Sequence, residues 1–505
     1  MKNRNNLRIC AAVLFVLVSS AFLPQVQAAD PLPTPLPGFT TTQDGCYPNF
    51  TTAEGCNALA LLGSGLGNTA VGWYSLFLVG NANFNTGIGA GALALTTTGG
   101  DSNTAVGAAA LLLNTSGTLN TAVGTDALLF NDVGHDNAAV GASALLNNFS
   151  GAANTAVGSE ALLFNDQTGH GAASGNTAVG QRALFNNIDA SANTAVGSVA
   201  LANNDSTGNA LAIQNTAVGS AALFANTDGA LNTAVGYQAL VNNTLGNGNT
   251  AIGWEALFHN TASVANTAVG EEALVSMTTG TANTAIGSGA LDNLTTGSFN
   301  IVVGQSGANI TTASNVICIG SDAMNVSNTT WIGNVFSTTT VSGTTLPVIV
   351  SDGGQLGTAP SARRFKKEIE PMDQASESIL ALKPVTFHYK SDKSNTPQFG
   401  LVAEDVAQVN SDLVVRNKDG EIYSVRYDAV NAMLLNEFLK EHKKVEQQDR
   451  RIREQETMIT QLKSELQATT ASQQRQIEAL TAGLQKVSAQ LEVSKPAAQI
   501  VVNNQ

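Results

Sequence analysis

The stretch Asn232-Thr-Ala-Val-Gly236-Tyr-Gln-Ala-Leu240-Val-Asn-Asn-Thr-Leu-Gly246 decides the fold, because close copies of it recur along more than half of the chain. Most copies follow at a step of 17 residues, with one step of 18, two of 22 and a last step of 15. The leading residues are Asn68, Asn85, Asn103, Asn120, Asn137, Asn154, Asn176, Asn193, Asn215, Asn232, Asn249, Asn266, Asn283, Asn300 and Asn315. A repeat this short indicates a solenoid of stacked coils. We therefore predict a mainly β fold, with a parallel β-roll or β-solenoid over residues 67–335.

Each repeat contains two apolar segments separated by turn-forming residues. Thr-Ala-Val is short and rich in β-branched residues, which favours a strand, and Gly236 can end that strand with a backbone shape that other residues resist. Ala239 and Leu240 form the second apolar segment, and the Asn-Asn-Thr run up to Gly246 forms the turn. We expect Val and Leu of successive coils to stack into one thin continuous core.

The Asn at the start of each coil has two readings. Asn side chains stacked at one place can form a ladder of hydrogen bonds, or Asn can serve only as a turn former, and the sequence leaves both open. The two longer steps contain insertions of five residues within 168–175 and 207–213. We expect both insertions to bulge from one edge of the solenoid.

The N-terminus has the pattern of a secretory signal peptide at residues 1–28. It begins with three basic residues, Lys2, Arg4 and Arg8. An apolar run at residues 9–18 is too short for a convincing membrane span, and small residues follow at the predicted cleavage site after Ala28 or Ala29. The sequence therefore predicts export, to a secreted or cell-surface location, with no membrane span after signal removal.

Residues 29–66 are rich in Pro and Thr and are interpreted as an extended lead-in followed by a cap. Cys46 and Cys56 lie close together there, and in an exported protein their spacing suggests a disulfide. Two free thiols, or pairing between chains, are the alternatives. Cys318 lies in a degenerate repeat and is interpreted as a small buried residue.

Charge is distributed very unevenly along the chain. Between Asp30 and Pro360, Arg182 is the only Lys or Arg, against 18 Asp and Glu residues, whereas residues 361–505 contain 20 basic and 20 acidic residues. The acidic part argues against nucleic-acid binding, which needs Lys and Arg to displace counterions. No metal-ligand spacing and no phosphate-binding loop is present in the sequence, so we predict no metal site and no cofactor.

The repeats resemble the heads of YadA-like trimeric adhesins, whose short Asn-Ser-Val-Ala-Ile-Gly coils form a left-handed parallel β-roll. This resemblance covers about half of the chain, and the step is longer here. It implies a homotrimer with three chains to a head, and an adhesin-like surface protein with a cell-surface or glycan ligand.

The composition changes after residues 336–360, a linker rich in Thr, Ser and Gly. From residue 432 to 493 apolar residues follow a heptad pattern, which predicts a coiled coil that overlaps the end of the preceding domain. The seam contains Phe438, Val445, Ile452, Ile459, Leu462 and Leu466, and after a four-residue stutter Ile477, Leu480, Leu484, Val487 and Leu491. A single amphipathic helix packed on its own domain is the alternative. Residues 494–505 are predicted to be a disordered tail.

Residues 361–456 resemble the intramolecular chaperone of endosialidases and phage tail spikes, which is also a self-cleaving serine peptidase family. The motifs that carry the resemblance are Ser361-Ala-Arg-Arg-Phe-Lys366-Lys-Glu-Ile369, Leu382-Lys-Pro-Val-Thr-Phe-His-Tyr389, Phe399-Gly-Leu-Val-Ala-Glu-Asp-Val406 and Tyr423-Ser-Val-Arg-Tyr427. The resemblance implies a small α+β domain that trimerises and leads into a helical stalk. It also implies that Ser361 and Lys366 form a catalytic dyad that cuts the bond between Pro360 and Ser361.

The chemistry of such a dyad is coherent, because serine becomes a good nucleophile only when a base accepts its proton. A lysine can act as that base only when neutral, which requires desolvation or nearby positive charge. A spacing of five residues suits neither one helix face nor one strand face, so a bent loop or a lysine from a neighbouring chain has to complete the pair.

The leading hypothesis is an exported trimeric fibre that is assembled by its own C-terminal domain, which the family resemblance also implies cleaves itself off before Ser361. The alternatives are a purely structural uncleaved spike, a solenoid that binds ice or another ordered lattice, and a glycan-binding solenoid. The lattice reading needs one outward-facing Thr in every coil. A glycan-degrading enzyme is disfavoured because the repeats contain no matched pair of carboxylates.

Overall fold

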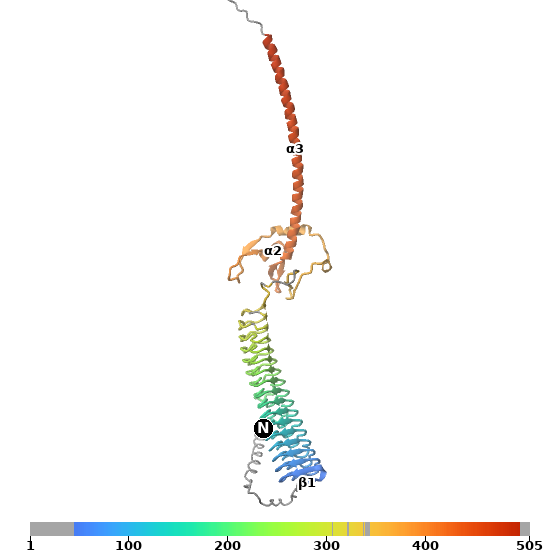
Figure 1. The fold of residues 1–505 in the computed structure, drawn as a ribbon, viewed down its shortest axis with the longest axis vertical. Helices are drawn as coiled ribbons and strands as arrows, with labels where there is room; N and C mark the ends of the chain where they lie inside the picture. The colour runs from blue at the N-terminus through green and yellow to red at the C-terminus, as the bar shows by residue number, and fades with distance from the viewer. Residues whose placement is uncertain (1–44, 306, 321–322, 337, 339–343, 495–505) are drawn as a thin grey trace, which may run out of the picture. The chain divides into compact units, whose positions relative to one another are not determined.

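The computed structural model describes residues 45–494 except for residues 306, 321–322, 337 and 339–343. The chain divides into two compact units, Met1–Thr339 and Thr340–Gln505 (Figure 1). The predicted signal peptide with its cleavage site at Ala28 or Ala29, residues 29–44 of the lead-in and the tail from residue 495 lie outside the described residues.

The first unit is a parallel β-solenoid, which confirms the predicted fold class. Each strand from β2 to β17 pairs in parallel with the next strand in the chain, so that the series ends at β18, while β1 pairs antiparallel with β2. The strands are β1 (Gly45–Tyr47), β2 (Thr51–Glu54), β3 (Thr69–Val71), β4 (Thr86–Ile88), β5 (Thr104–Val106), β6 (Thr121–Val123), β7 (Ala138–Val140), β8 (Thr155–Val157), β9 (Thr177–Val179), β10 (Thr194–Val196), β11 (Thr216–Val218), β12 (Thr233–Val235), β13 (Thr250–Ile252), β14 (Thr267–Val269), β15 (Thr284–Ile286), β16 (Ile301–Val303), β17 (Val316–Ile319) and β18 (Thr329–Ile332). A short 3-10 turn, η1 (Pro48–Phe50), joins β1 to β2. The parallel sheet thus begins at β2, before residue 67, the predicted start of the repeats.

The inner row of the strands is alanine, which corrects the expectation that Val lies in the core. In β12, Ala234 is fully buried while Thr233 and Val235 point outward, and the register places Ala234 beside Ala251 of the next coil. The space inside is small: a Cβ added to Gly87, the middle residue of β4, would lie 3.3 Å from Cγ of Leu76. Leu occupies the interior from the other segment of the coil, so the middle residue is small, Ala or Gly, from β3 to β15, and the larger Val302 takes this place in β16.

The second apolar segment contributes both of its residues to the core, as predicted for Leu. Ala239 and Leu240 are fully buried, and the backbone N–H of Leu240 donates to the carbonyl of Ala256 in the next coil. At the end of the strand, Gly236 has a φ of +136°, and a Cβ there would lie 2.3 Å from the carbonyl oxygen of Gly253. Glycine at this corner is therefore required both by backbone conformation and by the close approach of the next coil.

The leading asparagines from Asn68 to Asn300 form a buried ladder, which settles the reading that the sequence left open, whereas Asn315 is exposed and lies outside it. Oδ1 of Asn232 accepts from the backbone N–H of Asn249 at 3.0 Å and from its Nδ2 at 3.2 Å. Nδ2 of Asn232 also donates to the carbonyl of Gly246 at 2.8 Å. Each Asn therefore links its own coil to the next through groups that would otherwise be buried without partners.

A second ladder, which sequence analysis missed, is formed by nine buried Asn residues of the turn. They are Asn114, Asn131, Asn148, Asn165, Asn187, Asn204, Asn226, Asn243 and Asn260. Oδ1 of Asn260 has no partner, because the buried Met277 takes the equivalent place one coil later. Oγ1 of Thr96, one coil before Asn114, also has none. Among the described residues, both buried side-chain atoms without a partner thus lie at the two ends of this ladder.

Both insertions bulge from the coil, as predicted, and leave the two ladders continuous. Each follows an Asn-Asp pair, and a buried aspartate holds the loop. The carboxylate of Asp166 accepts from the backbone N–H groups of Ser150 and Gly171, both at 2.8 Å. Burial raises the pKa of Asp166, and these bonds oppose that shift. Asn187 still donates to Asn165 across the insertion at 3.0 Å.

The second unit is a small α+β domain that leads into a long helix. Its elements are β19 (Ile349–Val350), β20 (Leu356–Gly357), η2 (Arg363–Phe365), η3 (Asp373–Ala381), β21 (Val385–Phe387), β22 (Gln398–Gly400), α2 (Ala403–Val409), η4 (Ser411–Leu413), β23 (Val414–Arg416), β24 (Ile422–Val425) and α3 (Tyr427–Val493). The pairs β19–β20, β21–β22 and β23–β24 are antiparallel. Its buried core is small and consists of Ile379, Val406, Leu413, Val414, Val425 and Met433.

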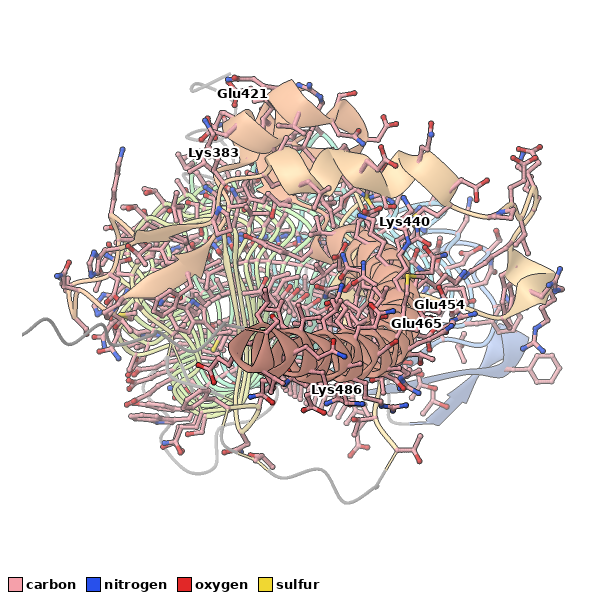
Figure 2. The ribbon with its side chains drawn as sticks, turned by 90° about the horizontal axis from the view of Figure 1, so that it is seen from above. Lys383, Glu421, Lys440, Glu454, Glu465 and Lys486 are labelled. Carbon is pink, nitrogen blue, oxygen red and sulfur yellow. The ribbon has the colours of Figure 1, made fainter. Side chains whose placement is uncertain are left out.

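The helix α3 spans 67 residues and covers the predicted coiled-coil segment. Met433, near its start, is its one buried residue within the described chain. Seam residues such as Ile459 and Leu466 are more than half exposed, and charged side chains including Glu454, Glu465 and Lys486 surround the helix (Figure 2). The alternative of a helix packed along its own domain is therefore wrong for most of α3. Its pairing with other helices stays a prediction.

Candidate active site around Ser361 and Lys366

A tight turn shapes the segment at the start of the second domain. Ala362 is extended, and η2 follows it, closed by bonds from Phe365 N–H to the Ala362 carbonyl and from Lys366 N–H to the Arg363 carbonyl, both at 3.0 Å. Lys366 then returns to an extended conformation. The chain therefore reverses between the two residues proposed as a dyad.

The turn brings Ser361 and Lys366 together within one chain. Nζ of Lys366 donates to Oγ of Ser361 at 3.2 Å, and both residues are exposed. Of the two arrangements that the spacing allowed, the bent loop is the one present. The distance is suitable for proton transfer between hydroxyl and amine, which is the geometric requirement for a serine–lysine dyad.

The surroundings of the pair are strongly basic. Arg363, Arg364 and Lys367 lie within six residues of Ser361. The guanidinium of Arg364 lies 4.8 Å from the ring centre of Phe365, and Lys367 lies 3.9 Å from the carboxylate of Glu368. Three cationic side chains thus lie close to the pair in sequence.

A second serine and lysine meet at a place that the sequence did not reveal. Oγ of the buried Ser376 donates to Oε1 of Glu437 at 2.5 Å, and Lys440 contacts the same carboxylate oxygen at 2.7 Å. The bond from Lys440 lowers the pKa of Glu437, and Glu437 in turn raises the pKa of Lys440. A lysine held in its charged form is no base, so this cluster fastens η3 to α3. The residues lie about sixty positions apart, and no sequence pattern links them.

The predicted disulfide stays a prediction. Cys46 lies on β1 opposite Thr52, and its side chain is outside the described residues, whereas Cys56 is exposed and free in the structure. Across the described part of the chain, no group of three or more His, Cys, Asp or Glu side chains is arranged to hold a metal ion. The described helices likewise include none with the length and apolar character of a membrane span.

A long parallel solenoid, followed by a small α+β domain that contains a Ser–Lys pair, fits a protein similar to tail spikes. Residues 361–415 match the model of a peptidase family described as chaperone of endosialidase. This part of the chain is therefore a chaperone-of-endosialidase domain, as its motifs predicted. No curated protein and no solved structure matches the chain. The resemblance of the repeats to YadA-like heads stays a prediction.

Proposed function

We propose that this protein is an exported homotrimeric fibre with an adhesin-like solenoid head, and that its C-terminal domain guides trimer assembly. The observation that carries the proposal is the apolar seam of α3, which is exposed along its length in the single chain. The small domain adds more unburied apolar surface, including Phe399 and Tyr423. Surfaces of this kind are normally covered by partner chains, and heptads indicate parallel helices as those partners.

Self-cleavage before Ser361 is the second part of the proposal, supported by the contact between Ser361 and Lys366. In this scheme Oγ of Ser361 attacks the carbonyl carbon of Pro360 while neutral Lys366 accepts the hydroxyl proton. The proton passes to the departing amide nitrogen, the C–N bond breaks, and the resulting ester is hydrolysed by water. The pair is exposed in the single chain, so packing between chains would supply the desolvation that the lysine needs. Cleavage would then follow assembly.

Mass spectrometry of the purified full-length protein tests the cleavage. We expect a C-terminal fragment beginning at Ser361, lost in Ser361→Ala and in Lys366→Arg. Lys367→Arg is the matched control, because it makes the same change at an adjacent exposed residue, and it should still be cleaved. A parent protein that stays full length after it has formed trimers would rule out the peptidase role and leave an uncleaved spike.

Light scattering tests assembly independently. We expect three times the chain mass for Ser361→Ala, which keeps head and stalk together. A monomeric mass for this variant at micromolar concentration would contradict the fibre proposal as a whole.

Lattice binding by the head is a second candidate, because the structure meets one of its requirements. Thr233 and its equivalents in most coils point outward from a regular ladder. Ice recrystallisation and glycan-array measurements on the trimer would test lattice and glycan ligands.

A further inference from the structure

We propose that one face of the solenoid, the Thr–Val face, is the surface through which the heads of three copies of this chain contact one another. The face consists of the outward side chains at the first and third positions of strands β3 to β16, together with Ile317 and Ile319 of β17. This inference rests on the proposed trimer and goes further by assigning the surface of the head that faces the trimer axis.

The third position forms a continuous apolar row whose members are exposed or half-buried. It is Val or Ile in every strand from β3 to β16. Val140 is 42% exposed and Ile252 is 40% exposed, although β-branched apolar residues usually become buried. Adjacent coils lie about 4.8 Å apart, so the row continues without a gap along the ladder. A contiguous apolar strip of this length is unusual on a free surface.

Repulsion between carboxylates disfavours contact between copies through the other surfaces of the head more strongly than through the Thr–Val face. Strands β3 to β18 contain no Asp, Glu, Lys or Arg, whereas the rest of the solenoid is acidic. The acids lie on corners and turns outside the strands, for example Glu255, Glu271 and Asp228. Copies of a strongly acidic rod repel one another, so they can approach closely only where carboxylates are absent.

The face also becomes more apolar toward the end of the head from which assembly would start. The first position is Thr in most strands but Ile301 in β16, and the register pairs Ile301 with Ile317 of β17. Ile319 of β17 is 45% exposed. These are among the last coils before residues 361–505 in the chain. If trimer assembly begins at the C-terminal domain, the most apolar coils of the three heads would come into contact first, and contact would then extend along the solenoid.

Thiol labelling of the full-length protein tests the assignment with a pair of matched positions. Val140 lies on the Thr–Val face, and Val133, 48% exposed, lies on the turn of the preceding coil. In Val140→Cys and Val133→Cys, each placed in Ser361→Ala, we measure the rate of reaction with a polyethylene-glycol maleimide. The parent protein gives the background from its native cysteines. We expect labelling at position 140 to be at least about tenfold slower than at position 133, and equal once the protein is unfolded.

The outcomes separate this inference from the proposed function. Equal native labelling rates in a protein that has trimer mass would overturn the Thr–Val face as the interface and leave it free for a lattice or another ligand. A monomeric mass would overturn both. Should either variant fail to fold, Val196→Cys and Leu231→Cys, on the face and on a turn respectively, provide a second pair with the same expected difference.

Discussion

At the scale of single residues, the leading Asn of a coil forms side-chain hydrogen bonds both within its own coil and to the next coil. Asn232 satisfies the buried N–H of Asn249 and the carbonyl of Gly246 at once. Removing its amide would leave both groups buried without partners, at about 1–3 kcal/mol each.

We therefore expect Asn232→Ala to lower the free energy of unfolding by about 3 kcal/mol. Urea denaturation followed by far-ultraviolet circular dichroism would measure it. Asn309→Ala, at an exposed position outside the ladder, is the control and should change little. Equal stability of the two variants would mean that the ladder accompanies the fold without stabilising it.

Residue patterns predicted the coil but not which side of it faces inward. In Thr-Ala-Val a period of two buries either the middle residue or its two neighbours, and hydrophobicity alone favours Val. Ala lies inside because Leu from the second segment fills the narrow interior, a property of the closed coil that no single strand reveals. The second Asn ladder could have been found, because its nine members follow the same steps as the first.

At the scale of elements, the seam of α3 distinguishes a partnered helix from an isolated one. Ile459 is on the seam and Met458 is not, yet both are exposed in the single chain, at 51% and 62%. An isolated helix would tolerate a charge at either position. In a coiled coil, only Ile459 would be placed in the apolar interior.

We expect Ile459→Asp to destabilise the proposed trimer by at least about 3 kcal/mol per helix, with Met458→Asp close to the parent protein. Light scattering across a dilution series, with helicity from circular dichroism, would report it. If both variants dissociate at the same concentration as the parent, α3 does not hold the chains together.

The cluster of Ser376, Glu437 and Lys440 that joins η3 to α3, called the clamp from here on, should stabilise the domain to a degree that depends on pH. The pKa of Glu437 lies below its ordinary value of 4.5, because Lys440 and Ser376 donate to its carboxylate. A depressed pKa contributes stability that is present above pH 4.5 and is lost as the pH falls through the folded-state value. Glu437→Gln should therefore lower the melting temperature of the second domain at pH 7, and the difference from the parent should shrink below pH 4.5.

Thermal unfolding at pH 7, 4 and 3 measures the dependence. Glu454→Gln, on an exposed part of α3, is the matched control and should follow the parent at every pH (Figure 2). A gap between Glu437→Gln and the parent that is independent of pH would assign the clamp to shape rather than charge.

At the scale of the whole molecule, the solenoid should behave as a stack of interchangeable units. Each coil bonds only to its neighbours, and Asn232 and Asn249 start equivalent coils in the same register. Stability in such a stack is close to a sum over coils and their interfaces.

We expect deletion of residues 232–248 to give a folded head one coil shorter, by about 4.8 Å, with little change in melting temperature. Small-angle scattering and circular dichroism would show it. Deletion of residues 232–240 alone removes part of a coil, so that the Asn residues of both ladders no longer align from coil to coil. This deletion should cause loss of folding in that region. A head that tolerates neither deletion would be cooperative over its full length.

The sequence predicted the residues of the candidate site, but it did not predict the contacts between segments that bring side chains together. Motif order identified the domain, and the positions of Ser361 and Lys366 followed from it, but a spacing of five could not say whether one chain completes the pair. That depends on the turn at η2, which local hydrogen bonds determine. The clamp of Ser376 and Lys440 was not predictable, because it joins segments that only the folded domain brings together.

The two insertions have a consequence for how this head can vary. The Asn side chains of both ladders bond from coil to coil, whether the step is 17 or 22 residues. A loop placed after an Asn-Asp pair can therefore lengthen without disturbing the coils on either side. The solenoid thus separates a part that must be repeated faithfully from a part that is free to diverge. Such a protein can acquire new loop sequences, by evolution or by protein engineering, while its framework of coils continues to fold unchanged.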